Sequence, residues 1–189
     1  LTAGSETLAE SRGELQFTET GLSGPAAFDI SRAASFCGED GVVHIDLLPD
    51  YGEAEIVQFL ADKEAALPKL SVEELLTGVI HNRLGKMLVK FAQISPNRKL
   101  CDLTETELRT VASACKNFEI KLHGVEGFDS AQVTAGGIKT TGVNPQTMES
   151  WFTPHLFICG EVLDIDADCG GYNLQWAWAS GYTAGRLGK

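Results

Sequence analysis

The part of the chain that most restricts its folding is a segment near the C-terminal end, EVLDIDADCGGYNLQWAWASGYTAG, residues 161–185. The apolar run HLFICGE, residues 155–161, leads into this segment and shares Glu161 with it. A short apolar run of this kind is typical of a strand buried on both faces of a parallel sheet. Two adjacent glycines, Gly170 and Gly171, then permit backbone conformations that other residues avoid. The sequence therefore predicts a strand, a tight loop and a helix.

This strand-loop-helix unit has two possible roles. Free N–H groups at the start of the helix suit phosphate or other electron-rich oxygens, and Gly170 and Gly171 carry no Cβ atoms to hold a ligand away. Glu161, at the carboxyl end of the strand, stands where an acid reaches a ribose or ribityl hydroxyl, and Asn173 offers both a donor and an acceptor. The alternative is a tight turn capped by Asn173, and the residues by themselves leave both interpretations open.

The predicted final helix is built from small side chains on one side. Ala177, Gly181 and Gly185 recur every four residues. Glycine inside a helix costs about 0.5–1 kcal/mol relative to alanine. We therefore expect these positions to pack closely against a sheet or another backbone.

Metal sites are not predicted. Asp164, Asp166 and Asp168 alternate as at the start of an EF-hand calcium loop, but the sixth position is Cys169 and the twelfth is Gln175, where that loop needs Gly and Glu. The five cysteines form no Cys-x-x-Cys pair, which favours reduced thiols over a zinc site or a disulfide framework.

The overall charge restricts the partners. The formal net charge of −11 argues against sequence-independent binding to nucleic acid or to anionic membranes. No apolar run approaches the roughly 20 residues of a membrane span, and the first residues lack the pattern of a signal peptide. We expect a cytoplasmic protein.

The first 50 residues predict mostly β structure. A short strand is expected around Leu15 and Phe17, and another over residues 42–49, which ends at a proline. Between them a helix is expected to begin near Pro25, because proline suits the first helical position.

Residues 51–118 predict helices. One is expected over residues 53–67, with Ile56, Phe59, Leu60 and Leu67 on its inner face. Capping boxes predict two further helix starts, at Ser71 with Glu74 and at Thr104 with Glu107, and apolar spacing predicts a helix after His81. Strands follow around Ile120 and over residues 132–134.

Several motifs together are similar to one flavoprotein family. They are FTETGLSGPAAFDIS, IDLLPD, VTAGGI, TMES and FICGEVLDIDADCGGYNLQWAWASGYTAG. They resemble the BaiN-like (YhiN-like, HI0933-like) bacterial NAD(P)/FAD-dependent oxidoreductases. The resemblance implies an α+β chain: an insert domain over residues 1–130, β-rich to 50 and helical over 51–118, and then residues 131–189 as the terminal strand-loop-helix of a doubly wound FAD-binding domain.

The resemblance also implies which residues lie beside the flavin. Glu161 corresponds to the acid that binds the ribityl chain, and residues 170–174 correspond to contacts near the pyrophosphate and the flavin pyrimidine edge. The full set of implied cofactor residues is Gly136, Gly137, Gly160, Glu161, Asp164, Gly170, Gly171, Tyr172, Asn173 and Leu174. Substrate contacts are expected near Gly21 to Pro25, including Ser23. No catalytic acid or base is marked.

One family motif is absent from this sequence. No two of its glycines are separated by a single residue, so it contains no GxGxxG for the ADP half of FAD. Gly142 and Trp151 also stand where the family usually has an acid and a lysine. We therefore expect a fragment of an oxidoreductase that transfers hydride from NAD(P)H to a small organic substrate, unable to hold FAD without the missing N-terminal half. The alternative is a non-catalytic module that self-associates through exposed apolar surface.

Overall fold

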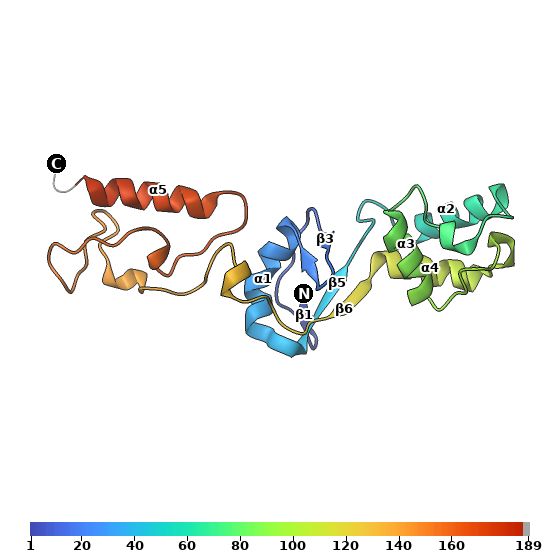
Figure 1. Ribbon diagram of the computed structural model, residues 1–189, viewed down its shortest axis with the longest axis horizontal. Coiled ribbons are helices and arrows are strands. Elements are labelled where there is room, and N and C mark those ends of the chain that lie inside the picture. The colour runs from blue at the N-terminus through green and yellow to red at the C-terminus, as the bar shows by residue number, and fades with distance from the viewer. Residues whose placement is uncertain (187–189) are drawn as a thin grey trace. The chain divides into compact units, whose positions relative to one another are not determined.

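The computed structural model describes residues 1–186, which form an α+β protein of five α-helices and short antiparallel strands (Figure 1). The described residues divide into two compact units. The helical unit is Val42–Lys121, and the two-segment unit is Leu1–Gly41 together with the residues from Leu122 onward. The predicted domain boundary near residue 130 stays a prediction.

The helical unit contains three α-helices, α2 (Glu53–Ala66), α3 (Asn82–Phe91) and α4 (Glu105–Lys116), drawn in teal, green and yellow-green in Figure 1. Strand β5 (Gly41–Ile45) pairs antiparallel with β6 (Phe118–Lys121), and their register places Val43 opposite Ile120. The predicted apolar stripes close around one core. Its fully buried side chains include Leu60, Leu75, Leu76, Leu88, Leu100, Val111 and Cys115.

Two details of this unit differ from the sequence-based prediction. The capping box at Ser71 is wrong: the Ser71 hydroxyl donates to the Pro96 carbonyl at 2.7 Å, and only a 3₁₀ turn follows, Val72–Glu74. The tertiary partner takes the hydroxyl that a helix start would have used. Of the four residues predicted on the inner face of α2, Ile56 and Leu60 are buried, but Phe59 and Leu67 are exposed.

The start of α4 confirms the other predicted capping box. The Thr104 hydroxyl accepts from the Glu107 N–H at 3.3 Å, and the Glu107 carboxylate accepts from the Thr104 N–H at 2.8 Å. Arg98 adds a bond that the sequence did not predict, since its guanidinium donates to Glu107 Oε1 at 2.5 Å. The Arg98 bond first, and the Thr104 bonds second, lower the pKa of Glu107 from 4.5 to about 2.

We expect Glu107→Gln to lower the free energy of unfolding of the helical unit by about 1 kcal/mol at neutral pH, since the pair is partly exposed. Because the folded pKa of Glu107 is depressed, its stabilisation is present above pH 4.5 and is lost as the pH falls toward about 2. Urea unfolding followed by circular dichroism across this range measures both effects. Glu105→Gln is the control, because its pair with Arg109 is exposed; equal losses in the two variants would contradict the prediction.

The two-segment unit begins with two short hairpins. Strand β1 (Thr2–Ala3) pairs with β2 (Glu6–Thr7), and β3 (Gln16–Phe17) pairs with β4 (Leu22–Ser23). Helix α1 (Pro25–Cys37) then begins at the predicted proline. Gly24 precedes it with φ +93°, and a Cβ there would lie 2.9 Å from the Glu14 carbonyl oxygen, so this turn requires glycine.

The C-terminal part of this unit contains helix α5 (Tyr172–Gly185), as predicted, but neither of the predicted strands. Residues 132–134 form no strand, and the run from His155 to Glu161 has only one paired neighbour, residues 148–150, through the bridge between Glu149 and Phe157. A strand buried in a parallel sheet needs a hydrogen-bonding neighbour on each edge. The described residues supply one edge only, so the run stays irregular.

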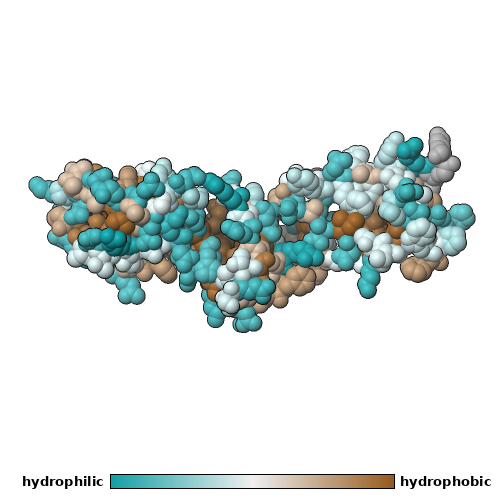
Figure 2. Space-filling model, turned by 180° about the vertical axis from the view of Figure 1, so that it is seen from behind, coloured by the Kyte–Doolittle hydropathy of each residue, from teal (hydrophilic) through white to brown (hydrophobic). Residues whose placement is uncertain are grey.

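The two-segment unit is thinly packed. Its C-terminal core comprises Val143, Met148, Leu163 and Ala184, with partly buried neighbours around them. Of the 17 large apolar side chains exposed on the described residues, 13 belong to this unit, and Figure 2 shows apolar residues at the surface among polar ones. Within residues 1–186, no helix has the length and apolar character to cross a membrane.

Candidate functional site

The start of helix α5 is an open cluster of backbone donors. Gly170 and Gly171 both have positive φ, +130° and +93°, and a Cβ added at Gly171 would meet nothing within 4 Å. The N–H groups of Tyr172, Asn173 and Leu174 have no acceptor among the described residues. Free N–H groups at a helix start carry partial positive charge, so an electron-rich oxygen of a ligand fits here.

The side chain of Asn173 is already engaged. Its Oδ1 accepts from the Ala167 N–H at 2.9 Å, and its Nδ2 donates to the Ala167 carbonyl at 2.8 Å. The amide therefore closes the loop from 167 to 173. It neither caps the helix nor projects a free amide toward a ligand, so its part in the site is to hold the glycine pair in place.

Helix α1 anchors the same loop through two residues that the sequence analysis missed. Asp29 Oδ1 accepts from the Cys169 N–H at 3.3 Å, and its Oδ2 accepts from the Ser11 hydroxyl at 2.8 Å. Arg32 forms an ion pair of 2.7 Å with Asp166. The available signal was the FDISR stretch, where an acid and a base lie one helical turn apart.

Gly160 is tied to the middle of α5. Its N–H donates to Ser180 Oγ at 2.9 Å, and its carbonyl accepts from the indole N–H of Trp176 at 3.1 Å. Ser180 is 2% exposed. Both backbone groups of Gly160 are therefore used inside the fold, which fixes the end of the apolar run against the helix.

The close packing predicted for the small residues of α5 is present at one position only. Ala177 lies 4.0 Å from the place of a Cβ on Gly160, whereas Gly181 and Gly185 face open space. The prediction is therefore wrong for these two glycines within the described residues. No backbone of the described chain lies against them.

One side of α5 carries exposed apolar side chains around these open glycines. Leu174, Trp178 and Tyr182 are 68%, 76% and 71% exposed. We call Leu174, Trp178, Gly181 and Tyr182 the α5 face. A hollow of about 480 Å³ on it is lined by Ala177, Trp178, Gly181 and Tyr182.

Within the second glycine pair, Gly137 has a structural function. Gly137 has φ +146°, and a Cβ there would lie 2.6 Å from the Val162 carbonyl oxygen. The chain approaches so closely because Ile138 donates to that carbonyl and accepts from the Asp164 N–H, both at 2.9 Å. Gly136 also has positive φ, but faces open space.

Glu161 lies at this same junction. Its Oε1 accepts from the Thr134 N–H at 3.2 Å, and the residue is exposed in a 3₁₀ turn, Gly160–Val162. The structure thus brings VTAGGI beside the segment from Glu161 to Asp164. Oε2 of Glu161 makes no hydrogen bond within the described residues, so it remains available to a ligand hydroxyl.

The remaining predicted positions lie elsewhere. Ser23 is in strand β4, opposite Gln16, and the side chains of Tyr172 and Asp164 are exposed. Among residues 1–186, no group of three or more potential ligand side chains could hold a metal ion.

Comparison with known proteins agrees with the resemblance. The profile described as HI0933-like protein barrel and H2TH domain matches residues 1–133. The chain is 37% identical over 186 residues to the 3-dehydro-bile acid delta(4,6)-reductase of Clostridium scindens. It is 36% identical over 171 residues to the ribosomal RNA dihydrouridine synthase of Escherichia coli, and 32% identical over 170 residues to that of Haemophilus influenzae.

The matches cover most of this chain but less than half of each relative. They span 97%, 90% and 89% of the chain, and 46%, 41% and 40% of the relatives in the same order. A family profile that covers more than half of the chain establishes membership. The chain therefore belongs to the HI0933-like family and is related to oxidoreductases.

Proposed function

We propose that this chain is part of a flavin-dependent reductase that saturates a carbon–carbon double bond conjugated to a carbonyl group. The names of two relatives support this reaction class. A 3-dehydro bile acid with 4,6 double bonds is a conjugated ketone, and the double bond reduced to give dihydrouridine is conjugated to a ring carbonyl. In both substrates the carbonyl withdraws electrons, which makes the far carbon of the double bond a hydride acceptor.

The observation that carries the proposal is the set of unpaired N–H groups at the start of α5, beside the open glycine pair. They would bind an electron-rich oxygen of the cofactor, at the flavin pyrimidine edge or the pyrophosphate. FAD, when bound, supplies the two-electron chemistry that carries hydride from NAD(P)H to such a double bond. The residues present fit FAD on one side only.

The other residues of the site have supporting parts in this proposal. Glu161 would accept from a ribityl hydroxyl through Oε2, while its Oε1 keeps the Thr134 segment in place. Asn173 and Asp29 hold the loop that presents Gly170 and Gly171. In this proposal the hydrogen bonds of Asn173 and Asp29 hold the loop from the protein side, and the opposite side of the loop is left open for the cofactor.

We further propose that the α5 face packs against the part of the longer relatives that this chain does not span, and that this part holds the ADP half of FAD. More than half of each relative lies outside the match. The exposed indole, phenol and leucine side chains around open glycines are the kind of surface that another element covers. The reading frame around this sequence is the first check: a GxGxxG motif after a predicted strand supports the assignment.

The decisive experiment compares two alanine substitutions in the protein made at the full length of its reading frame. We expect Gly171→Ala to weaken FAD binding about tenfold, because a methyl group would stand beside the free N–H groups. Gly4→Ala is the control, since Gly4 also has positive φ and open space but lies in the first hairpin. Flavin fluorescence during titration with FAD measures the affinity.

The outcomes separate the alternatives. This chain by itself is expected to purify without colour, and the full-length protein with a flavin absorbance band. Full-length protein that stays colourless and does not bind added FAD would refute the proposal. If Gly171→Ala and Gly4→Ala weaken FAD binding equally, the start of α5 is not part of the cofactor site.

A further inference from the structure

We propose that Ser180 and Trp176 are positioning residues for the cofactor site, because they hold Gly160 in place and thereby fix the carboxylate of Glu161. The inference rests on the proposed function, in which Glu161 accepts from a ribityl hydroxyl of FAD. It adds two residues in the body of α5 that act on the cofactor through another residue. All of these residues belong to the two-segment unit.

The burial of Ser180 is the observation that needs an explanation. Within residues 1–186 it is the only polar side chain that is buried, with 2% of its surface exposed. Burying a hydroxyl group is unfavourable unless its hydrogen bonds are made inside the protein. Alanine would pack at this position at least as well in a helix, because it has the higher helix propensity. The hydroxyl group therefore has a role that packing does not explain.

Thr183, in the next turn of α5, shows that a bond to the helix backbone is not this role. Its Oγ1 donates to the Ala179 carbonyl at 2.9 Å, just as Ser180 Oγ donates to the Trp176 carbonyl at 2.6 Å. Thr183 is only half-buried, and its hydroxyl receives no bond from another segment of the described residues. The bond that distinguishes Ser180 is the one that it accepts from Gly160.

Ser180 and Trp176 together bind both backbone groups of Gly160, and we call these two residues the Gly160 clamp. Ser180 Oγ accepts from the Gly160 N–H at 2.9 Å, and the indole N–H of Trp176 donates to the Gly160 carbonyl at 3.1 Å. The same carbonyl accepts from the Leu163 N–H at 3.2 Å. Gly160 has φ +74°, a conformation that other residues avoid. The clamp therefore fixes a sharp turn of the backbone on one side of a rigid helix.

Glu161 directly follows this turn, so the direction of its side chain depends on the clamp. Its Oε1 accepts from the Thr134 N–H at 3.2 Å, while Oε2 makes no hydrogen bond within the described residues. An exposed glutamate loses conformational entropy when it binds a ligand, and this loss is smaller when the side chain is already fixed. Loosening the clamp is therefore expected to lower the affinity for FAD without removing a group that contacts it.

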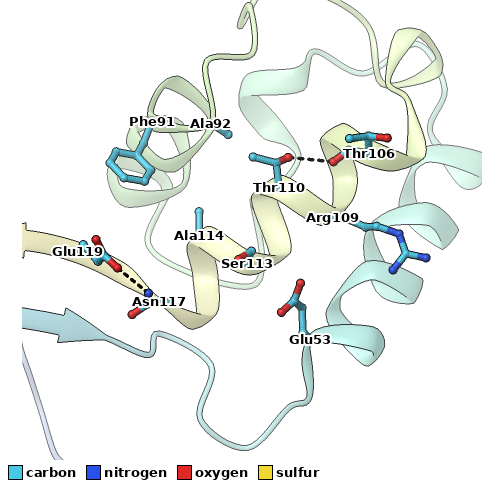
Figure 3. Close-up of a pocket in the computed structure, with 10 residues that line it drawn as sticks. All are labelled: Glu53, Phe91, Ala92, Thr106, Arg109, Thr110, Ser113, Ala114, Asn117 and Glu119. Atoms are coloured by element: carbon cyan, nitrogen blue, oxygen red, sulfur yellow. Dashed lines mark hydrogen bonds between the residues drawn. The ribbon is translucent and has the colours of Figure 1, made fainter. Parts of the chain in front are cut away.

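The larger hollow of the molecule has no buried polar group of this kind. It is a groove of about 520 Å³ in the helical unit, and all of its polar side chains are exposed (Figure 3). Two of the bonds there join neighbours on the surface, from Asn117 to Glu119 at 2.8 Å and from Thr110 to the Thr106 carbonyl at 2.9 Å. Contacts within the groove account for these groups, whereas the burial of Ser180 is accounted for by Gly160.

The first measurement is the NMR shift of the Thr134 amide proton in this chain. A hydrogen bond to a carboxylate is stronger than one to a neutral amide, so Glu161→Gln is expected to move this proton upfield. Ser180→Ala and Trp176→Phe are expected to move it most of the way to the same value. Trp176→Phe keeps an aromatic ring and removes the indole N–H, so it tests the clamp even if Ser180→Ala does not fold. Thr183→Ala is the control and is expected to leave the shift unchanged.

The second measurement is the affinity for FAD of the protein made at the full length of its reading frame, followed by flavin fluorescence. We expect Ser180→Ala to weaken FAD binding about tenfold, the effect of about one lost hydrogen bond. In a Glu161→Gln background the same substitution is expected to weaken binding by less than about twofold, because the carboxylate through which it acts is gone. A merely structural role of Ser180 would give the same factor in both backgrounds.

Two results would overturn the proposal. One is an unchanged Thr134 shift in the folded clamp variants, and the other is an equal loss of FAD affinity with and without Glu161→Gln. The NMR measurement needs no flavin, so it decides whether the clamp holds Glu161 even if the full-length protein binds no FAD, the result that refutes the proposed function. Circular dichroism establishes that each variant is folded before the comparison.

Discussion

Trp178→Asp is expected to weaken self-association of this chain about 100-fold. The Trp178 side chain is 76% exposed on the α5 face, beside a hollow and two glycines that no described backbone covers. An indole of this kind is a common centre of an interface, and a buried, unpaired carboxylate is strongly unfavourable there. In a solution of this chain alone, the α5 face of one copy has only another copy to pack against. Light scattering over a range of protein concentrations measures the molar mass.

Phe128→Asp is the matched control for this prediction. Phe128 is 84% exposed in the same unit, but it stands in an isolated 3₁₀ turn, Phe128–Ser130, outside the α5 face. A monomer at every concentration, or the same loss in both variants, would contradict the assignment of α5 as the interface. Under the proposed function, a protein that corresponds to the part of the relatives outside the match is expected to replace the second copy when it is added, which distinguishes a cofactor-domain surface from a dedicated dimer interface.

Gly137→Ala is expected to destabilise the C-terminal part of the two-segment unit by about 3 kcal/mol. A methyl group at this position would stand 2.6 Å from the Val162 carbonyl oxygen, on a backbone at φ +146°. Either residue 137 or the 162–164 segment must move, and the bonds between Ile138 and that segment are then lost. Amide hydrogen exchange is expected to accelerate at Ile138 and Asp164, and to stay slow in the core of the helical unit.

Gly136→Ala separates the cost of a positive φ from the cost of the steric clash expected at residue 137. Gly136 also has positive φ, +97°, but a Cβ there would meet nothing within 4 Å. Its cost is therefore expected to be only the conformational one, about 1 kcal/mol. Equal destabilisation by the two substitutions would show that the close approach at Gly137 is unimportant to the fold.

The helical unit illustrates what local sequence decides. Thr104 and Glu107 begin α4 as predicted, because each bonds to the backbone of the other and no distant residue is needed. The same pattern at Ser71 and Glu74 failed, since the Ser71 hydroxyl has a distant partner, the Pro96 carbonyl. A capping box is a local preference of about 1 kcal/mol, and one tertiary hydrogen bond is of the same size.

The candidate site illustrates what long-range contacts decide. The sequence identified Gly170, Gly171 and Glu161, and the structure places the glycines at an open helix start and Glu161 at the junction with Thr134. Sequence spacing gave no access to Asp29, which reaches the glycine loop from more than a hundred residues away. It also assigned Asn173 to a ligand or a cap, whereas the amide closes its own loop.

By itself, the sequence predicted the five α-helices, the tight loop at Gly170 and Gly171 and the membership of a family, because each of these depends on short-range preferences or on matching motifs. Tertiary structure alone decided which apolar surfaces are covered. The run at His155 to Glu161 and the α5 face both have the composition of buried elements, yet the first is paired on one edge and the second is open. An apolar segment is buried only when another element packs against it, and the composition of the segment does not show whether such an element is present.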